Sequence, residues 1–421
     1  MSTAPIILCV HGVASLQGLK GSKATRSKYL PVVFSCLGHL YIHLCTAFYF
    51  VIVLSIEEDW QLPYPELLEL WTLGSLLVGV AALPAGLLSD RIGASAMMVL
   101  FFVGLGGASI AAGFAPSPPG LLVALAGLGF FAAIYHPVGI PWLVRSASTS
   151  RGKLLGINGV FGALGSALAG LAAGALIELS GWRAAFIVPG ILCVATGVVL
   201  FAFWVTGGLG ENAPAASAKK PVSAADSRRV FLILLVTMFT GGLIFHCTQT
   251  SLPKLFELQS DGLAGEGALG VGLLVAIVYG VSGLMQVLGG HLADRLPLKP
   301  VYVGSIAIQI PTLWLASWLG GLPLLLVATT MVMAGASALP AENLLLAHYT
   351  QEKHHGLVFG LKFALSFGAA PLAVGLVAYT TRRTGEPSLI YVLLAFVALA
   401  SFLFAMFLPR ENKLSKLSAT P

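Results

Sequence analysis

Two charged side chains stand inside long apolar stretches of this sequence. Glu342 lies in the stretch 322–347, and Lys362 lies in the stretch 356–380. A charge at the centre of a bilayer costs about 2.5–3.5 kcal/mol on insertion scales, so such side chains tend to face a polar cavity and to have a function. Each lies roughly 9 Å from the inner end of its helix, at about 1.5 Å per residue. They have opposite charges and could pair, either as a structural salt bridge or as a site that binds a ligand or a proton.

Histidines form the second group of residues with chemical potential. His39 and His43 are four residues apart and therefore share one face of a helix. That spacing can bind a metal, but no Cys, Glu or third His accompanies it in an obvious motif. The sequence therefore favours a polar cavity wall over a metal site, and it predicts no metal and no cofactor. His246 and Gln249 offer similar polar chemistry in a later stretch.

His136 is followed directly by Pro137. Histidine can change its charge near physiological pH, and a proline in a helix frees a backbone carbonyl for hydrogen bonding. Two interpretations remain open. His136 could relay protons or contact a ligand, or it could be a neutral histidine that is hydrogen-bonded to a neighbouring helix.

The elements that must position these side chains are membrane helices. Hydrophobic residues make up 57% of the 421 residues and charged residues only 10%, against roughly a quarter in soluble domains. Apolar runs long enough to cross about 30 Å of hydrocarbon recur throughout, without the alternation of membrane strands. We therefore expect an all-α membrane protein in a lipid bilayer. The twelve predicted spans are 30–54, 68–89, 96–114, 119–145, 153–178, 183–205, 230–252, 267–290, 300–318, 322–347, 356–380 and 388–408.

A repeated motif divides these spans into two halves. Gly86-Leu87-Leu88-Ser89-Asp90-Arg91-Ile92-Gly93 returns 204 residues later as Gly290-His291-Leu292-Ala293-Asp294-Arg295-Leu296-Pro297. The same shift relates Lys362 to Asn158, which adds Asn158 to the candidate site. The prediction is a tail at 1–29, a six-helix bundle at 30–206, a linker at 207–229, a second six-helix bundle at 230–408 and a tail at 409–421.

The basic residues predict the orientation. With the N-terminus in the cytoplasm, 18 of the 23 Lys and Arg residues fall on the cytoplasmic side and four on the other, while Lys362 lies within a span. We therefore expect both termini to lie on the cytoplasmic side of the membrane, and we expect that membrane to be a bacterial inner membrane. The net charge of +6 is interpreted as this topology signal, so no nucleic-acid partner is expected.

On these motifs the chain resembles the major facilitator superfamily of transporters from about residue 30 to 408. His39, Tyr135-His136-Pro137 and Leu252-Pro253 further resemble the bacterial fosmidomycin-resistance-type members. This chain departs from that subgroup at His43 and at Leu83-Pro84. The resemblance implies two pseudo-symmetric bundles that rock about a central cavity, lined in part by the spans that hold Glu342 and Lys362.

The resemblance also assigns a role to the repeated motif. In the superfamily the motif's aspartate contacts a neighbouring helix end and latches one conformation. Here the latch would consist of Gly86, Asp90 and Arg91, with Gly290, Asp294 and Arg295 in the second copy. The alternative is a charged turn that only sets the topology.

The function expected from these features is secondary active transport of a small polar or amphiphilic solute by a monomer. The sequence has no nucleotide-binding motif, so an ion gradient should drive transport, with protons as the leading candidate and Glu342 and His136 as titrating groups. In the superfamily that the chain resembles, a glycine-rich fifth span that contains Gly-Pro is associated with export. Here the span holds Gly162, Ser166, Gly170 and Gly174 but lacks that proline, so export is only the favoured direction, and plain helix packing also explains these residues. Two alternatives remain: a transporter-like receptor or assembly factor without solute flux, and a membrane enzyme. The enzyme is the less favoured of the two, and we do not expect one.

Overall fold

The computed structural model describes residues 23–146, 151–209, 224–265, 267–350 and 355–409. These residues are almost entirely helical, and no β-strand occurs among them. The helices of the first half are α2 (Lys23–Ala47), α3 (Tyr49–Trp60), α4 (Tyr64–Glu69), α5 (Thr72–Val80), α6 (Ala82–Ile92), α7 (Ala94–Gly113), α8 (Pro118–Ala132), α9 (Tyr135–Ser146), α10 (Arg151–Ser180) and α11 (Trp182–Val205). Those of the second half are α12 (Ala224–Gln259), α13 (Gly267–Arg295), α14 (Leu298–Ala316), α15 (Gly321–Tyr349), α16 (His355–Thr384) and α17 (Ser388–Met406).

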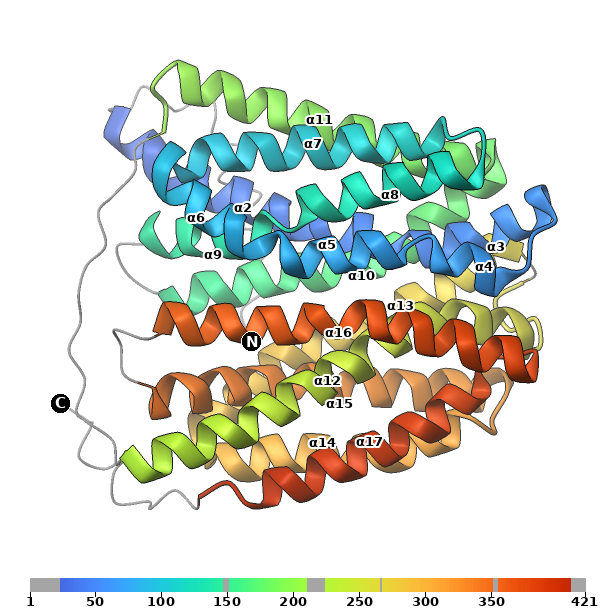
Figure 1. The fold of residues 1–421 in the computed structure, drawn as a ribbon. Helices are drawn as coiled ribbons and strands as arrows, with labels where there is room; N and C mark the ends of the chain where they lie inside the picture. The colour runs from blue at the N-terminus through green and yellow to red at the C-terminus, as the bar shows by residue number, and fades with distance from the viewer. Residues whose placement is uncertain (1–22, 147–150, 210–223, 266, 351–354, 410–421) are drawn as a thin grey trace, which may run out of the picture.

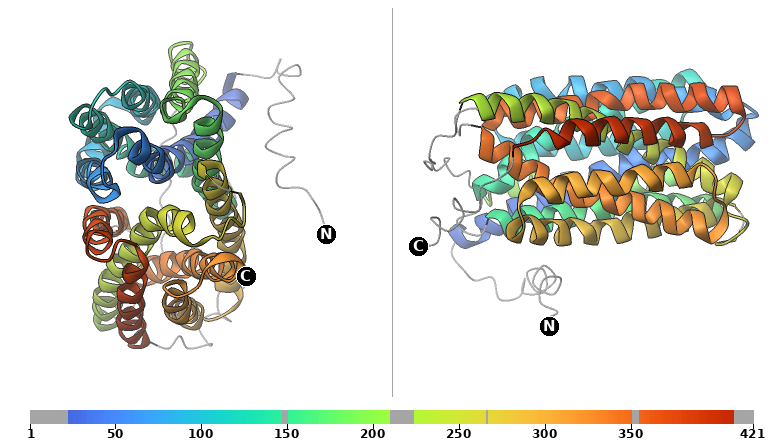
Figure 2. Two further views of the ribbon diagram at one scale, coloured as in Figure 1. Left: turned by 90° about the vertical axis from the view of Figure 1, so that its right-hand side faces the viewer. Right: turned by 90° about the horizontal axis from the view of Figure 1, so that it is seen from below.

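The helices form two groups that lie side by side. In Figure 1 the N-terminal half, blue to green, lies above the C-terminal half, yellow to red, and the end-on view in Figure 2 separates the two groups. The main contacts between the halves run along α10 and α13 and between α5 and α16. The first described helix begins, and the last one ends, at the same end of the molecule (Figure 1). We call this end the terminal face and the other end the opposite face.

Three predicted spans are broken helices. The first consists of α2 and α3, the second of α5 and α6, bent by 46°, and the fourth of α8 and α9. In the second and fourth spans a proline, Pro84 or Pro137, is the third residue after the break. A proline has no N–H for the carbonyl four residues earlier, so the helix cannot continue with a full set of hydrogen bonds. In the first span the Thr46 hydroxyl donates to the Ile42 carbonyl at 2.7 Å, a bond that often accompanies a bend.

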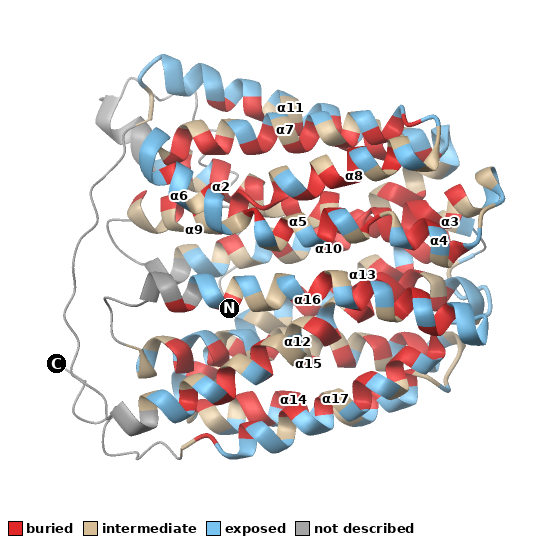
Figure 3. Cartoon of the chain, in the orientation of Figure 1, coloured by how far each residue is buried: buried red, intermediate tan, exposed pale blue. Residues whose placement is uncertain are grey.

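Length and composition support a multi-pass membrane protein. Ten of the described helical spans are long and apolar enough to cross a membrane, and the bent second span brings the number to eleven. The ninth predicted span, α14, falls short because Lys299 and Gln309 lower its hydropathy. Many large apolar side chains are exposed, such as Leu83 at 73% exposure, as expected for contact with lipid. Figure 3 shows exposed residues, in pale blue, along the helices.

Two helices begin well before their predicted spans. Helix α2 begins at Lys23, within the expected tail, and α12 begins at Ala224, within the expected linker. Helical backbone can extend beyond the hydrocarbon, because charged side chains at helix ends remain solvated at the membrane surface. The rest of the predicted linker between 210 and 223, and the predicted tails at 1–22 and 410–421, lie outside the described residues.

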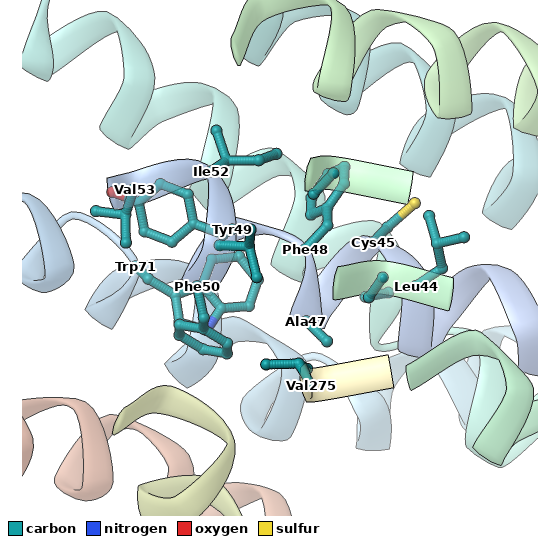
Figure 4. Close-up of a cluster of buried hydrophobic side chains, with 14 of the residues drawn as sticks. Leu44, Cys45, Ala47, Phe48, Tyr49, Phe50, Ile52, Val53, Trp71 and Val275 are labelled. Carbon is teal, nitrogen blue, oxygen red and sulfur yellow. The ribbon is translucent and has the colours of Figure 1, made fainter. Parts of the chain in front are cut away.

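The largest hydrophobic core surrounds the break in the first span. Figure 4 shows Phe48, Tyr49 and Phe50 at this break, with Trp71 beside them. All four side chains are buried, and the Tyr49 hydroxyl donates to the Leu67 carbonyl at 2.6 Å. The same core continues into the second half of the chain through helices α12, α13 and α16. The break in the first span is therefore held by packing from both halves.

Polar contacts between the halves gather at the opposite face. The Lys254 ammonium on α12 lies 2.7 Å from a carboxylate oxygen of Glu57 on α3, and Arg382 on α16 lies 2.9 Å from Glu69 on α4. The Tyr64 hydroxyl also donates to the Thr250 carbonyl at 3.1 Å. Among the described residues, both ion pairs that join the two halves lie at this face. The opposite face is therefore closed in this structure.

Candidate functional site

A small cavity lies between the two halves, near the breaks of the first and fourth spans. Its volume is about 30 Å³, which is room for very few water molecules. Imidazole, hydroxyl and amide groups line it together with aromatic rings. The lining residues on which the argument depends are His43, Thr46, Trp71, His136, Phe245, His246, Gln249 and Phe367. Three histidines that the sequence analysis selected separately thus share one cavity.

Beside this cavity the predicted pair on the first span meets a third histidine. His39, His43 and His136 each offer a ring nitrogen, and the three nitrogens lie within 4.8 Å of one another. The ring centroids are 4.9 Å apart for His39 and His43, and 5.5 Å and 5.8 Å apart for each of these with His136. Sequence analysis missed this cluster because His136 is remote in the chain and only the packing of α9 against α2 brings it close.

His136 is the most unusual member of the cluster. Its side chain is 7% exposed, and neither ring nitrogen has a hydrogen-bond partner among the described residues. The ring lies against the C-terminal half of the chain, with its centroid 5.2 Å from Phe363 and 4.9 Å from Phe367 on α16. The alternative of a neutral histidine that is hydrogen-bonded to a neighbouring helix is therefore wrong for the arrangement seen here.

Asn158 lies beside the cluster and holds it in place. Its backbone carbonyl accepts a hydrogen bond from His39 Nδ1 at 2.7 Å, and its side-chain amide donates to the Tyr135 hydroxyl at 2.8 Å. The Tyr135 hydroxyl in turn donates to the Ser35 carbonyl at 2.9 Å. The ring of Tyr135 stacks on that of His39, with centroids 5.1 Å apart. Asn158, 2% exposed, thus ties α10 to α2 and α9 and positions the His39 ring.

Glu342 and Lys362 form the ion pair that their positions suggested. The Lys362 ammonium lies 2.6 Å from Glu342 Oε1, and both residues are 6% exposed. Two further residues complete the network: the Tyr302 hydroxyl donates to Glu342 Oε2 at 2.9 Å, and Lys362 donates to Asn343 Oδ1 at 2.5 Å. Sequence analysis missed these two partners. Asn343 could have been found because it is a polar residue directly after Glu342 in the sequence. Tyr302 could not, because a tyrosine in an apolar helix does not stand out.

Helix α16 contributes to both this network and the cavity, at different positions along its length. Lys362 precedes Phe363, whose ring contacts His136, while Phe367, Ala370 and Val374 of α16 line the cavity. Gln249 and His246 reach the cavity from α12, as their polar character suggested. Helix α16 therefore links the buried charges on one side with the histidine cavity on the other.

The repeated motif lies at the terminal face in both copies. The glycines take equivalent positions: a Cβ on Gly86 would lie 3.4 Å from Pro137, and one on Gly290 would lie 4.0 Å from Pro340. Asp90, Arg91, Asp294 and Arg295 are all exposed. Within the part of the chain that the structure describes, no ion pair joins either aspartate to a neighbouring helix. The latch therefore stays a prediction, and the segments 147–150 and 351–354 lie outside the described residues.

The glycine stripe of the fifth span packs helices together. A Cβ on Gly170 would lie 2.8 Å from the Gly272 carbonyl, and one on Gly174 would lie 2.5 Å from the Ala268 carbonyl, both on α13. These small residues allow α10 and α13 to approach closely, as in other membrane helix pairs. Packing between the halves accounts for Gly170 and Gly174, and Gly162 lies against His39 of the same half, so the stripe needs no statement about the direction of transport.

Solved structures with the same arrangement of helices are transporters. A D-xylose–proton symporter matches with a TM-score of 0.72 at 15% sequence identity, over 91% of this chain and 98% of its own. A bacterial homologue of the human lysosomal transporter Spinster, in an inward-facing and unoccupied conformation, matches with a TM-score of 0.67 at 16% identity, over 92% and 95%. At these identities the likeness concerns the fold alone.

Two relatives resemble the sequence itself. The "Gallate transporter" of Pseudomonas putida is 27% identical over 419 residues, covering 87% of this chain and 88% of the relative. The "Uncharacterized MFS-type transporter YwoD" of Bacillus subtilis (strain 168) is 26% identical over 261 residues, which are 61% of this chain but only 53% of that protein. The family model of the Major Facilitator Superfamily matches residues 35–269 and 264–420, nearly the whole chain. The chain is therefore a multi-pass membrane transporter, not an enzyme, and it belongs to the major facilitator superfamily.

Proposed function

We propose that this transporter moves a small polar or amphiphilic solute through the cavity between its halves and couples that movement to protons. The observation that carries the proposal is the cavity itself, where imidazole, amide and hydroxyl groups from both halves meet aromatic rings. At about 30 Å³ the cavity is too small for a solute of this kind. The halves must therefore part to admit one, as alternating access requires.

Small aromatic carboxylates are the solutes to test first. The relative from Pseudomonas putida is named a gallate transporter, and the cavity offers matching chemistry. Trp71, Phe245 and Phe367 present rings against which a flat molecule can stack, while His246 and Gln249 present groups for its oxygens. This combination of an apolar wall with a few placed polar groups is common in small-molecule sites.

The proposed proton site is the Glu342–Lys362 pair. A proton on Glu342 would cancel the attraction that holds Lys362 at 2.6 Å, leaving the ammonium with Asn343. Because Lys362 lies on α16, the release acts on the helix that contacts His136 through Phe363 and lines the cavity further along. Protonation on α15 can thereby alter the cavity wall. His136 has no role as a proton carrier in this proposal.

The orientation proposed from the basic residues puts the terminal face in the cytoplasm. The closed opposite face would then be the periplasmic one. The glycine stripe first suggested export, but its glycines allow close helix packing. We therefore propose coupling to protons without proposing whether the solute moves into or out of the cell. Flux must accordingly be measured both into and out of vesicles.

The test is solute flux in proteoliposomes across an imposed pH gradient. We expect the purified protein to accumulate at least one member of an aromatic carboxylate panel when a gradient is applied, and much less when an ionophore dissipates it. Glu342→Gln should abolish the response to the gradient. Glu58→Gln, which changes an exposed glutamate at the opposite face, is the matched control and should transport like the wild type. A Glu342→Gln protein that keeps gradient-driven accumulation would refute the coupling site, and a wild type without accumulation would refute the proposed function.

A further inference from the structure

The cluster of His39, His43 and His136 has the geometry of a metal site. Its three ring nitrogens lie within 4.8 Å of one another. Zinc binds histidine nitrogens at about 2.0–2.1 Å with tetrahedral geometry, which sets neighbouring nitrogens about 3.3 Å apart. Each nitrogen would then move by less than about 1 Å, a shift that small side-chain rotations supply. We propose that these three histidines bind a divalent transition-metal ion of the zinc class.

The hydrogen bond of His39 leaves one of its ring nitrogens free for a metal. A carbonyl oxygen can only accept, so the 2.7 Å contact with the Asn158 carbonyl places the proton on His39 Nδ1. The lone pair is then on Nε2. Histidines that bind metals almost always donate their other ring N–H to a carbonyl, a carboxylate or a water in this way, which fixes the orientation of the ring.

His136 supplies the observation that points to a ligand. Its two ring nitrogens are buried and have no hydrogen-bond partner among the described residues. A buried polar group left without a partner costs about 1–3 kcal/mol. A metal ion would take the lone pair of one nitrogen and remove the cost at that nitrogen. The Phe363 and Phe367 rings that pack on His136 hold it near the other two histidines without competing for its nitrogens.

The fourth position of the proposed ion faces the central cavity. His43 and His136 both line that cavity, together with His246 and Gln249. Among the described residues that line it, none has a carboxylate, so three neutral imidazoles would leave the charge of a divalent ion unbalanced in a buried place. We therefore expect an anion from solution to occupy the fourth position. An all-imidazole donor set also favours Zn²⁺, Ni²⁺ or Cu²⁺ over Mg²⁺ and Ca²⁺, which prefer oxygen.

This inference goes beyond the proposed transport function, and its test requires no flux. The full-length protein is purified with a tag that has no histidines, treated with chelator and placed in lipid nanodiscs. Zn²⁺ is titrated in competition with a chromophoric chelator, and Co²⁺ is added separately to record its visible absorption. We expect one equivalent of Zn²⁺ per chain, a tetrahedral Co²⁺ spectrum and tighter Zn²⁺ binding when benzoate is present.

Ligand variants separate this site from other histidines. His136→Phe keeps a ring against Phe363 and Phe367 but has no nitrogen, and it should weaken Zn²⁺ binding at least tenfold. His43→Gln should do the same and serves as the second variant if the first unfolds. The controls His291→Ala and His348→Ala change exposed histidines, and a double variant of His354 and His355 changes the adjacent pair; all should bind like the wild type. The proposal is overturned if the wild type binds no Zn²⁺, if both ligand variants bind normally, or if the controls lose the ion.

Discussion

The buried pair of Glu342 and Lys362 allows a prediction whose size and sign follow from the structure. Replacing Lys362 by Met leaves the Glu342 carboxylate, 6% exposed, with the Tyr302 hydroxyl as its one donor among the described residues. Removing one partner of a buried pair costs about 3–5 kcal/mol. Lys362→Met should therefore lower the free energy of unfolding by about 3–5 kcal/mol.

The reverse replacement has a similar cost. Glu342→Gln leaves the Lys362 ammonium buried without its carboxylate, although Asn343 Oδ1 still accepts a hydrogen bond from it. It should therefore also lower the free energy of unfolding by about 3–5 kcal/mol.

The double variant, with Lys362→Met and Glu342→Gln combined, completes a double-mutant cycle. With both charges removed, nothing ionic stays buried, so the loss should be well below the sum of the two single losses, with a coupling energy of about 3 kcal/mol. Denaturant unfolding in detergent micelles measures all three variants. Losses that add in the double variant would refute the argument.

Three shorter predictions concern other contacts. Gly129→Ala drives a Cβ into the Gly74 backbone and should cost about 1–3 kcal/mol in denaturant unfolding, whereas Gly241→Ala, with nothing within 4 Å, should change stability by less than about 0.5 kcal/mol; equal effects would contradict the packing. Glu57→Gln weakens the 2.7 Å contact with Lys254 that helps to close the opposite face. It should therefore raise the alkylation rate of a Thr250→Cys reporter at that face about fivefold, whereas Glu58→Gln should leave that rate unchanged. Gly162→Ala places a Cβ 2.7 Å from the His39 ring and should weaken Zn²⁺ binding about tenfold; Gly156→Ala, with nothing within 4 Å, is its control, and equal affinities would argue against the site.

Much of the fold follows from the sequence because the membrane narrows the choices. Apolar length and the repeated motif were enough to predict the helices and their division into halves. The breaks were harder to place. Pro84 and Pro137 signal two of them through their missing N–H, but Pro189 and Pro311 stand inside unbroken α11 and α14. Whether a proline breaks a helix depends on packing around it, and a single sequence does not record that packing.

The candidate site was predictable in part. Glu342 and Lys362 stood out because charges are expensive in hydrocarbon, and their pairing followed from equal depth. The repeat located Asn158 but not its contacts. Lys362 reaches Asn343 on the preceding helix, whereas Asn158 reaches Tyr135 on the preceding helix and holds His39 through its backbone. The meeting of His136 with the first span was missed because it depends on how α9 packs against α2.

The closed opposite face makes the response of the transporter to salt depend on the side of the membrane. Glu69 and Arg382 have side chains about half exposed, at 45% and 50%, so dissolved ions can screen this contact. Only the aqueous compartment on that side can supply those ions, because the membrane separates it from the other. Salt added on the side of the opposite face would therefore weaken the contact between Glu69 and Arg382. The same concentration on the other side of the membrane would leave that contact unchanged.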